Sequence, residues 1–574
     1  SALAHFIPSE IHKANQQAME KLGMNSVNAC PLTPLGFLER AATAFGGCRS
    51  VVYHDVVWTW SQTFRRCLRL ASALVSLDVS RGDVVSALLP NVPAMYEMHF
   101  GVPMSGAVLN TINTSLDAPT VAVLLAHSGA KIIFADPAFL PLLTDALRLL
   151  PPGGQPAPCV ILVEDPYYEE ESTTTHELAV LTTYEMLLEK GDPEFTWVRP
   201  ATEWDPMILN YTSGTTSAPK GVVNCHRGIF LITVNSLIDW AVPARPTFLW
   251  TLPMFHANGS SFPWGMAMVG GTNVCLRSVD AAEVYATIDR HGVTHLCASP
   301  MVLNVLTNAP EGVRRLPATG KVRVLTGGAQ LPAAVLELAE AVGFQVSHGY
   351  GLSETGGLVV SCVLKDEWNK LPAPERARLK TRQGVRTPVM AEVDILDSET
   401  GRSVPHDGST MGEIVLRGSC VMLGYLNDDK ATQAALRDDG WFHTGDIGVM
   451  HPDGYLEIRD RSKDVIVSGG DNISSMEVES ALYDHPAVNE AAVVARPDEV
   501  LGEAPCAFVS LKEACTVTAN ELIAWSWERM PHFMVPKTII FRAELPKTST
   551  GKMKKYVLRD LASGMGPTRG SSEM

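Results

Sequence analysis

Short apolar runs rich in β-branched residues alternate with amphipathic stretches along most of this 574-residue chain. The runs predict buried strands that end in loops, and the clearest lie at residues 131–136, 159–165, 321–328 and 344–351. The stretches predict helices at 63–77, with Phe64, Leu68, Ala71 and Val75 on one face, and at 331–342. Such alternation is typical of βαβ units, in which helices cover both faces of a parallel sheet. Ligands bind such sheets where strands give way to loops, so functional residues are expected there.

The pattern changes near Arg459. Residues 451–460 predict a β-hairpin with Asp453 and Gly454 at its turn. The residues after it predict strand, helix, two strands, helix and strand, an α+β unit of about 110 residues that is long enough for its own core. We therefore expect a large domain over residues 1–459, a small domain after it, and a flexible tail over residues 562–574, which have almost no apolar pattern.

Charge and composition argue against several classes of protein. The 46 Lys and Arg residues oppose 62 Asp and Glu residues, and the formal charge of −16 argues against nucleic acid as a partner. No apolar stretch reaches the ~18–20 residues of a membrane helix, and no secretory signal is visible. The 11 cysteines, with no CxxC pair, favour a reducing compartment over a disulfide framework or a zinc site.

One loop predicts phosphate binding. Residues 211–221 follow an apolar run and are dense in hydroxyls and glycine. The expected contacts are backbone N–H groups around Gly214, the charge of Lys220, and the hydroxyls of Thr212, Ser213, Thr215 and Thr216. The order of Gly214, Lys220 and Gly221 is not that of a Walker A loop. The alternative reading of the loop is a flexible Ser/Thr turn.

The same loop resembles the nucleotide loop of adenylate-forming enzymes, the superfamily of acyl-CoA synthetases, peptide-synthetase adenylation domains and beetle luciferases. Further stretches resemble the superfamily's motifs in the same order, at residues 253–259, 347–356, 443–446, 460–464 and 546–552. The similarity extends upstream to residues 88–97 and 109–117. Residues 461–479 and 530–537 look most like plant acyl-activating enzymes, which include benzoate- and cinnamate-CoA ligases.

The resemblance implies a fold and a reaction. The fold is α/β, with a large N-terminal domain of parallel and mixed sheets between helices (αβαβα), a small β-barrel-like subdomain, and a small, mobile α+β C-terminal domain over residues 464–561. The reaction joins a carboxylic acid to ATP, which gives acyl-AMP and pyrophosphate, and CoA then displaces AMP to give acyl-CoA. ATP and CoA are thus implied as co-substrates, with Mg²⁺ as cofactor.

The chemistry explains the residue types that the motifs share. Adenylation brings two anions together, so the site must supply positive charge where charge accumulates. The resemblance assigns Lys552 as the cation between carboxylate and α-phosphate, and Glu354 as a Mg²⁺ ligand, with Thr212 as a second. It assigns Asp446 to the ribose hydroxyls and Arg461 to the ribose or α-phosphate. The other nucleotide-binding residues that it implies are Gly328, Ala329, His348, Gly349, Tyr350 (stacked on adenine), Gly351 and Ser353.

Further roles also follow from the resemblance. His256 is implied at the wall between the acyl pocket and the CoA channel, with catalytic importance. The implied acyl pocket contains His256, Asn258, Gly327 and Gly328, and the implied CoA contacts are Ser468, Gly469 and Gly470. Residues 460–463 are implied as a hinge centred on Lys463, about which the small domain rotates between the two half-reactions. Without the resemblance, each of these residues has an ordinary structural interpretation. Lys552 and Lys463 would be charged surface residues, and Asp446 would cap the segment that follows it. Arg461 would form an ion pair, and His256 would be a structural histidine.

The identity of the acid is narrowed rather than fixed. Amino-acid-activating relatives place Asp beside the pocket Phe, whereas Phe255 is followed here by His256, so an aromatic or short-to-medium aliphatic acid is expected. Two other functions stay open: a P-loop-type phosphotransferase or ATPase, which would release ADP, and a catalytically silent acyl- or nucleotide-binding protein.

The chain is expected as a monomer or homodimer in the cytoplasm. The cytoplasm is favoured because residues 572–574 carry an acid where the peroxisomal signal of plant relatives carries a base, and the peroxisome stays open as the alternative.

Overall fold

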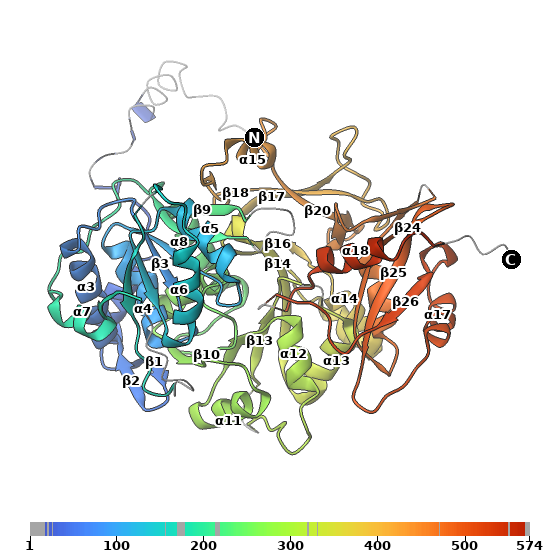
Figure 1. Ribbon diagram of the computed structural model, residues 1–574, viewed down its shortest axis with the longest axis horizontal. Helices are drawn as coiled ribbons and strands as arrows, with labels where there is room; N and C mark the ends of the chain where they lie inside the picture. Colours follow the sequence, from blue (N-terminus) through green and yellow to red (C-terminus); the bar gives the residue numbers. More distant parts are fainter. Residues whose placement is uncertain are drawn as a thin grey trace, which may run out of the picture.

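Figure 1 shows the computed structural model of the chain as a large domain with a small domain beside it. The structure describes residues 18–19, 22–23, 25, 27–154, 156–168, 178–212, 219–317, 321–329, 331–469, 471–548 and 551–568. Within this part of the chain, no helix combines the length and the apolar character that crossing a bilayer requires.

An eight-stranded sheet forms the first half of the large domain. Its core is parallel, and the hairpin of β8 and β9 and the short β19 add antiparallel strands at one edge. In spatial order the strands are β19 (Gly424–Tyr425), β9 (Gly221–Cys225), β8 (Pro206–Tyr211), β4 (Val108–Thr111), β3 (Val84–Leu88), β5 (Ile132–Ala135), β6 (Cys159–Leu162) and β7 (Val180–Thr183).

A nine-stranded sheet forms the second half. Its centre is parallel, and its edges are antiparallel. In spatial order the strands are β16 (Val385–Arg386), β15 (Gly357–Ser361), β14 (Gln345–Leu352), β13 (Arg323–Thr326), β12 (His295–Cys297), β10 (Thr247–Trp250), β11 (Thr272–Cys275), β1 (Arg49–Tyr53) and β2 (Val56–Thr59). The predicted strands at 131–136, 159–165, 321–328 and 344–351 are thus confirmed as β5, β6, β13 and β14.

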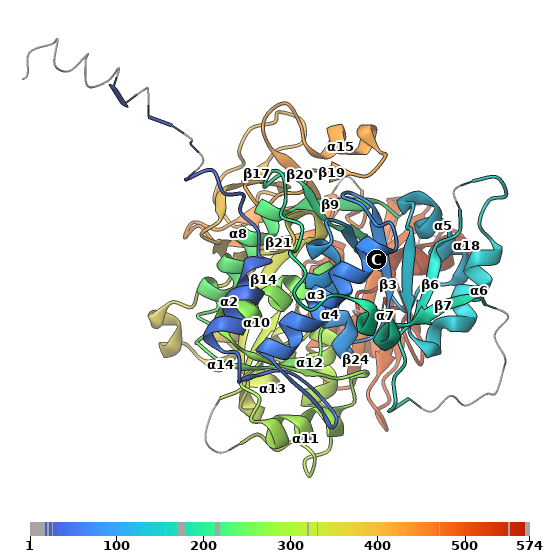
Figure 2. The ribbon, with the colours of Figure 1, turned by 90° about the vertical axis from the view of Figure 1, so that its left-hand side faces the viewer.

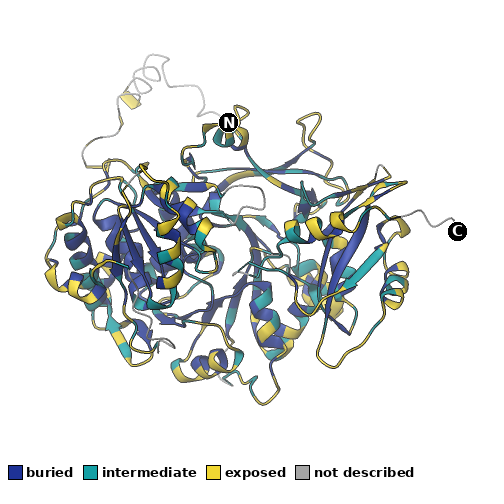
Figure 3. Ribbon diagram, in the orientation of Figure 1, coloured by how far each residue is buried: buried dark blue, intermediate teal, exposed yellow. Residues whose placement is uncertain are grey.

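Helices lie between the two sheets and outside each of them. The inner layer contains α2 (Gly36–Ala44), α3 (Trp60–Ser76), α4 (Pro93–Met104) and α10 (Phe262–Val269), which contact one another (Figure 2), together with α8 (His226–Asp239). The outer faces are covered by α5 (Ala118–Ser128) and α6 (Leu140–Arg148) on one sheet and by α11 (Ala281–His291), α12 (Pro300–Thr307) and α13 (Ala333–Val342) on the other. The other helices of the large domain are α7 (Tyr184–Lys190), α9 (Ala257–Ser260), α14 (Ala373–Lys380) and α15 (Asp429–Ala435). This layering confirms the αβαβα architecture, and Figure 3 shows its strands buried while the outer helices expose one face.

Helix α3 corrects one sequence prediction. A capping box at Thr59 starts the helix, as its sequence favours. The predicted face is confirmed at Leu68 and Ala71, which are buried, and is wrong at its two ends, since Val75 is exposed and Phe64 is only partly buried. The buried stripe also contains Cys67 and Leu70, and Gly101 of α4 allows the close approach of Leu70, since a Cβ at Gly101 would lie 2.6 Å from Leu70 Cδ2.

A four-stranded antiparallel sheet completes the large domain at the place where a barrel-like subdomain was expected. Its order is β17 (Met390–Leu396), β18 (Gly412–Gly418), β20 (Phe442–Met450) and β21 (Leu456–Arg461). The predicted hairpin is confirmed as β20 and β21, and Gly454 at its turn has a φ of 81°. Because β21 runs to Arg461, the first two residues of the expected hinge belong to this sheet.

The small domain has its own sheet and its own core. The sheet contains β22 (Ile466–Ser468), β23 (Asp471–Ile473), β24 (Val488–Asp498), β25 (Gly502–Leu511) and β26 (Thr538–Phe541), with helices α16 (Ser475–Tyr483), α17 (Ala519–Trp527) and α18 (Lys555–Gly564). Two apolar clusters line the sheet, one with α16 and α17 and one with α18. The small α+β domain is thus confirmed. The expected start of the tail is wrong, because Ala562 is fully buried inside α18 and Thr568 bridges to Asp498.

Candidate active site

Asp446 and Arg461 form the centre of the candidate site. They are register partners on β20 and β21, and Arg461 Nε lies 3.3 Å from Asp446 Oδ1. Tyr350 on β14 donates a hydrogen bond of 2.7 Å to Asp446 Oδ2, so the nine-stranded and four-stranded sheets meet at this carboxylate. Burial, and then the neighbouring Asp446 charge, raise the pKa of Tyr350. The two oxygens retain lone pairs, so Asp446 can accept further hydrogen bonds.

Glu354 lies in a second polar cluster. It follows β14 in a 3-10 turn (Ser353–Thr355), and its Oε1 accepts a hydrogen bond of 2.8 Å from Tyr425 on β19. Lys220 Nζ lies 4.7 Å from the centre of the same tyrosine ring. Asn224 fixes the turn by donating to the Ser353 carbonyl at 3.1 Å. Tyr425 therefore connects the expected metal ligand to the expected phosphate-binding lysine.

The predicted phosphate loop is described only at its ends. Thr212 N–H donates to the Lys220 carbonyl at 3.0 Å, which closes the loop between β8 and β9. Ser213, Gly214, Thr215 and Thr216 lie outside the described residues. The structure thus brings Thr212 and Lys220 together and leaves the other phosphate contacts as predictions.

Lys552 reaches the site from the small domain. Its pKa is lowered to about 8, first by burial and then by the positive charges of Arg461 and Lys463, although Asp446 acts in the opposite direction. The pKa of His256 is lowered to about 4, by burial and by the positive charge of Lys552. Within the described residues, no carboxylate lies at ion-pair distance from Lys552 Nζ. These charge effects indicate that the ammonium lies within electrostatic range of Arg461, Asp446 and His256.

Gly551 allows this placement. Its φ is 79°, and a Cβ there would lie 2.5 Å from Met301 Cβ on α12 of the large domain. Nearby, Asn304 Nδ2 of the same helix donates to Asn489 Oδ1 of the small domain at 3.5 Å. The Lys552 loop thus rests directly on α12, and the small domain lies beside α12 and α13 in Figure 1.

Strand packing explains why glycine is needed at two of the positions expected around the nucleotide. A Cβ at Gly327 would lie 2.9 Å from the Gly349 carbonyl, and one at Gly351 would lie 2.0 Å from the Gly357 carbonyl. Strands β13, β14 and β15 could not approach so closely with side chains there. Gly328 and Ala329 follow β13 in the adjoining loop.

His348 is buried on β14. Burial lowers its pKa to about 4, so the ring is neutral near pH 7. Gln383 Nε2 donates to His348 Nε2 at 3.2 Å, while Gln383 Oε1 accepts from the Ile458 N–H on β21 at 2.6 Å. The geometry therefore assigns His348 a structural contact between sheets, and its nucleotide role stays a prediction.

The expected acyl pocket begins with an unusual turn. Five consecutive residues have positive φ, namely Ala257 (43°), Asn258 (48°), Gly259 (58°), Ser260 (52°) and Ser261 (69°). A left-handed conformation costs roughly 1–2 kcal/mol for each residue other than glycine, so this turn is strained. Asn258 is fully buried, and neither of its amide atoms has a hydrogen-bond partner within the described chain. Sequence reasoning missed the strain, since Gly259 alone indicates a left-handed residue.

The expected hinge and CoA contacts lie on the small-domain side. Lys463 follows β21 in a turn, and its pKa is lowered to about 8 by burial and by the charge of Arg461. Ser468 is buried on β22, and Gly469 N–H donates to the Leu501 carbonyl at 2.9 Å. Gly470 lies outside the described residues. The hinge and CoA roles stay predictions.

The Mg²⁺ site that the resemblance implies would be held by Glu354 and Thr212. In the described ranges, no group of three or more His, Cys, Asp or Glu side chains could hold a metal ion. Tyr425 occupies Oε1 of Glu354, and no described residue pairs with Oε2. Hard oxygen donors suit Mg²⁺, so a site completed by phosphate oxygens fits these residues.

Two protein-family models match the chain, one within the large domain and one within the small domain. The model of the AMP-binding enzyme family matches residues 38–426, more than half of the chain, and that of the AMP-binding enzyme C-terminal domain matches residues 477–552. The chain belongs to the AMP-binding enzyme family. It is 59% identical to a 2-methylpropanoate–CoA ligase from Humulus lupulus (96% of this chain, 99% of the relative). It is 56% identical to a probable peroxisomal acyl-activating enzyme from Arabidopsis thaliana, with the same coverage.

A solved structure supports the same conclusion. The o-succinylbenzoate CoA synthetase from Bacillus subtilis, in complex with its acyl-adenylate intermediate, aligns with a TM-score of 0.75 at 26% identity, over 94% of this chain and 99% of the other. The predicted superfamily and the predicted reaction class, an AMP-forming acid–thiol ligase, are thus confirmed.

Two residues of the site were missed by sequence reasoning. Tyr425 stands apart from every motif, and only the pairing of β19 with β9 brings it to Glu354. Gln383 contacts both β14 and β21 from a loop with no distinctive pattern. No local signal marks either residue, because both act through partners that are distant in the sequence.

Proposed function

We propose that this AMP-forming ligase activates a small carboxylic acid with Lys552, delivered by the small domain, as the cation between the acid and ATP. Two observations support the proposal: the Lys552 loop of the small domain rests on α12 of the large domain, and the lysine ammonium lies within electrostatic range of the Asp446–Arg461 pair and His256. A carboxylate and the α-phosphate of ATP repel each other, and a cation between them stabilises the charge that accumulates as they react.

The surrounding residues have distinct proposed roles. Asp446 accepts hydrogen bonds from the ribose, and Arg461, held by Asp446, contacts the ribose or the α-phosphate. Tyr350 presents its ring to adenine while its hydroxyl stays on Asp446. Glu354, oriented by Tyr425, would hold Mg²⁺ with Thr212, and the ion supplies positive charge to phosphate oxygens when bound. His256 is neutral near pH 7, so it adds no second positive charge to the acid pocket.

The second half-reaction needs a different arrangement. Thiol attack requires the face of acyl-AMP that Lys552 occupies to be cleared, with CoA approaching along residues 468–470. We propose that the small domain, which starts at residue 464 and includes all of α18, rotates against the large domain, over residues 1–459, about the hinge at residues 460–463. Since β21 ends at Arg461, the dihedral change falls on Ser462 and Lys463.

The acid is proposed to be short and apolar. The 2-methylpropanoate ligase of Humulus lupulus shares 59% of its residues with this chain, which makes short branched acids the first candidates and benzoate-like acids the second. The compartment is proposed to be the cytoplasm, with the peroxisome as alternative because one relative is named as peroxisomal.

An acid panel tests the function. Purified enzyme with Mg-ATP is given 2-methylpropanoate, hexanoate, benzoate or cinnamate, with and without CoA, and the products are separated. The expected products are AMP and pyrophosphate, with an acyl-CoA when CoA is present. Release of ADP would favour the phosphotransferase, and no turnover with any acid would favour the catalytically silent protein. A Lys552→Ala variant identifies background hydrolysis.

A further inference from the structure

The end of strand β21 caps the first helix of the small domain. Ser475 N–H and Ser475 Oγ both donate to Asp460 Oδ2, at 2.7 and 2.6 Å. Ser474 Oγ donates to the Arg459 carbonyl, and the Arg459 guanidinium pairs with Glu477. Two consecutive large-domain residues thus contact three of the first four residues of the α16 capping turn.

These contacts are buried and electrostatically favourable. Asp460 is 2% exposed and Ser475 is fully buried. The first N–H groups of a helix lack partners inside the helix, and a negative charge there is stabilised by the helix dipole. Ser474, the N-cap residue of α16, accepts a hydrogen bond from the Glu477 N–H, and Asp460 supplies from β21 the acceptor that the Ser475 N–H lacks within the helix.

The cap is connected to the lysine loop. Lys555 at the start of α18 contacts Ser475 Oγ, and its Nζ lies 2.7 Å from Glu479 Oε1 on α16. Lys555 is three residues beyond Lys552, so α16, α18 and the Lys552 loop form one unit. Whatever fixes α16 against β21 therefore also fixes the position of Lys552.

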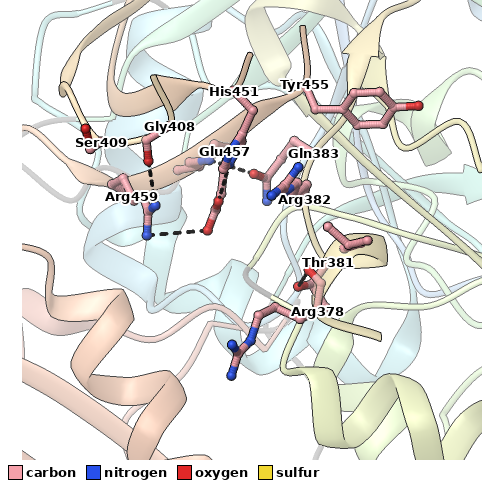
Figure 4. A network of polar contacts seen from close by, with 12 residues as sticks. Arg378, Thr381, Arg382, Gln383, Gly408, Ser409, His451, Tyr455, Glu457 and Arg459 are labelled. Atoms are coloured by element: carbon pink, nitrogen blue, oxygen red, sulfur yellow. Dashed lines mark hydrogen bonds and ion pairs between the residues drawn. The ribbon is translucent and has the colours of Figure 1, made fainter. Parts of the chain in front are cut away.

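Arg459 is itself held in place by the large domain, as Figure 4 shows. Its Nη2 donates to the Gly408 carbonyl at 3.3 Å, and its Nη1 lies 3.5 Å from Glu457 Oε1. His451 Nε2 in turn lies 2.7 Å from Glu457 Oε2. The guanidinium is thus oriented before it meets Glu477 of the small domain.

We propose that Asp460, assisted by Arg459, is a positioning residue that holds the small domain in the arrangement with Lys552 inserted. The inference rests on the proposed two-arrangement function. Asp460 lies on β21, before Ser462 and Lys463 where the dihedral change falls, and Ser475 follows them, so rotation about Lys463 is expected to separate the two residues. The capping contacts therefore stabilise the adenylating arrangement alone, and the balance between the two half-reactions depends on them.

Half-reaction rates test this role. Asp460→Ala and Ser475→Ala are compared with wild type in acid-dependent exchange of ATP with pyrophosphate, and in thioester formation from supplied acyl-AMP and CoA. Loss of a buried, charged hydrogen bond predicts a fall of about 10- to 100-fold in exchange for Asp460→Ala, which corresponds to ~1.4–2.8 kcal/mol, and a smaller fall for Ser475→Ala. Thioester formation is expected to be unchanged or faster.

A matched control separates positioning from general damage. Asp498 is also a buried small-domain carboxylate, paired with Lys537 at 2.8 Å, but all the described hydrogen-bond partners of its side chain belong to the small domain. Asp498→Asn is expected to change both half-reactions equally. An equal loss of both for Asp460→Ala would overturn the proposal.

A distance measurement keeps the test independent of the chemistry. Cys159 of the large domain and Cys515 of the small domain are both exposed, and spin labels on them, with Cys30→Ser to remove a third exposed thiol, report the domain arrangement. Asp460→Ala is expected to broaden or shift the distance distribution relative to wild type and Asp498→Asn. An unchanged distance distribution in Asp460→Ala overturns the proposal. If the wild-type enzyme activates no acid, that result refutes the proposed function alone, and the distance measurement still tests the role of Asp460.

Discussion

Gly551 offers a direct way to push Lys552 out of the site without removing it. A Cβ at this position would lie 2.5 Å from Met301 Cβ and 2.9 Å from Met301 Sδ. Because the nearer atom is a Cβ, rotation of the methionine side chain cannot relieve the overlap. In Gly551→Ala the small domain must therefore move away from α12 or the contact must be strained.

The structure separates two costs of this substitution. The left-handed φ of 79° costs an alanine ~1–2 kcal/mol, wherever the small domain lies, if the loop keeps its conformation. The overlap costs ~1–3 kcal/mol, as for other overpacked contacts, and arises only against α12. Only the second cost shifts the domain balance, and at 1.4 kcal/mol for each factor of ten it predicts a loss of adenylation of about 5- to 150-fold.

Two assays check the prediction. Acid-dependent exchange of ATP with pyrophosphate is expected to fall by this factor, while thioester formation from supplied acyl-AMP stays near wild type. Gly566→Ala is the control, because Gly566 has a φ of 73° and nothing lies within 4 Å of its added Cβ. Wild-type exchange in Gly551→Ala, or an equal loss of both activities, would refute the reasoning that the loop must rest on α12.

Three further predictions follow from the same geometry. Lys552 must be protonated to neutralise two anions, so kcat/KM for adenylation is expected to fall as pH rises through about 8. Lys552→Arg is expected to move this alkaline limb of the pH profile to higher pH. An alkaline limb that does not move would show that another group causes the fall. Lys463→Pro is expected to restrict the hinge and to slow thioester formation selectively, and an unchanged second step would argue against the hinge. Tyr425→Phe removes the hydrogen bond that orients Glu354 and is expected to raise KM for Mg-ATP by about 2- to 10-fold, so an unchanged KM would separate Tyr425 from nucleotide binding.

Much of the fold could be predicted because its signals are local. The apolar runs became β5, β6, β13 and β14, and Asp453 and Gly454 marked the turn of the β20–β21 hairpin. Helix α3 shows the limit of such signals. Its position along the chain was predicted at residues 63–77, but its buried face was predicted only in part, because the burial of Leu70 depends on the close approach that Gly101 of α4 allows.

The candidate site divides in the same way. Asp446 and Arg461 were each found by a motif, but their pairing follows from the register of two strands. Tyr425 on Glu354, Gly551 on Met301 and Asp460 on Ser475 join residues that are 71, 250 and 15 positions apart. Each contact depends on how strands, helices and domains pack. The residue pattern of one segment therefore does not predict which residue of a distant segment it will contact. The left-handed turn at residues 257–261 is likewise set by its surroundings, since four of its five residues are not glycine.

The central claim concerns the charge that the small domain delivers. Lys552→Ala removes it and leaves every large-domain contact in place. Pyrophosphate exchange and thioester formation from supplied acyl-AMP are measured on the same preparation, with the preferred acid from the panel. We predict that exchange falls by orders of magnitude while thioester formation largely survives. An equal loss of both steps, or exchange at the wild-type rate, would contradict the assignment of Lys552 as the cation that allows an acid to react with ATP.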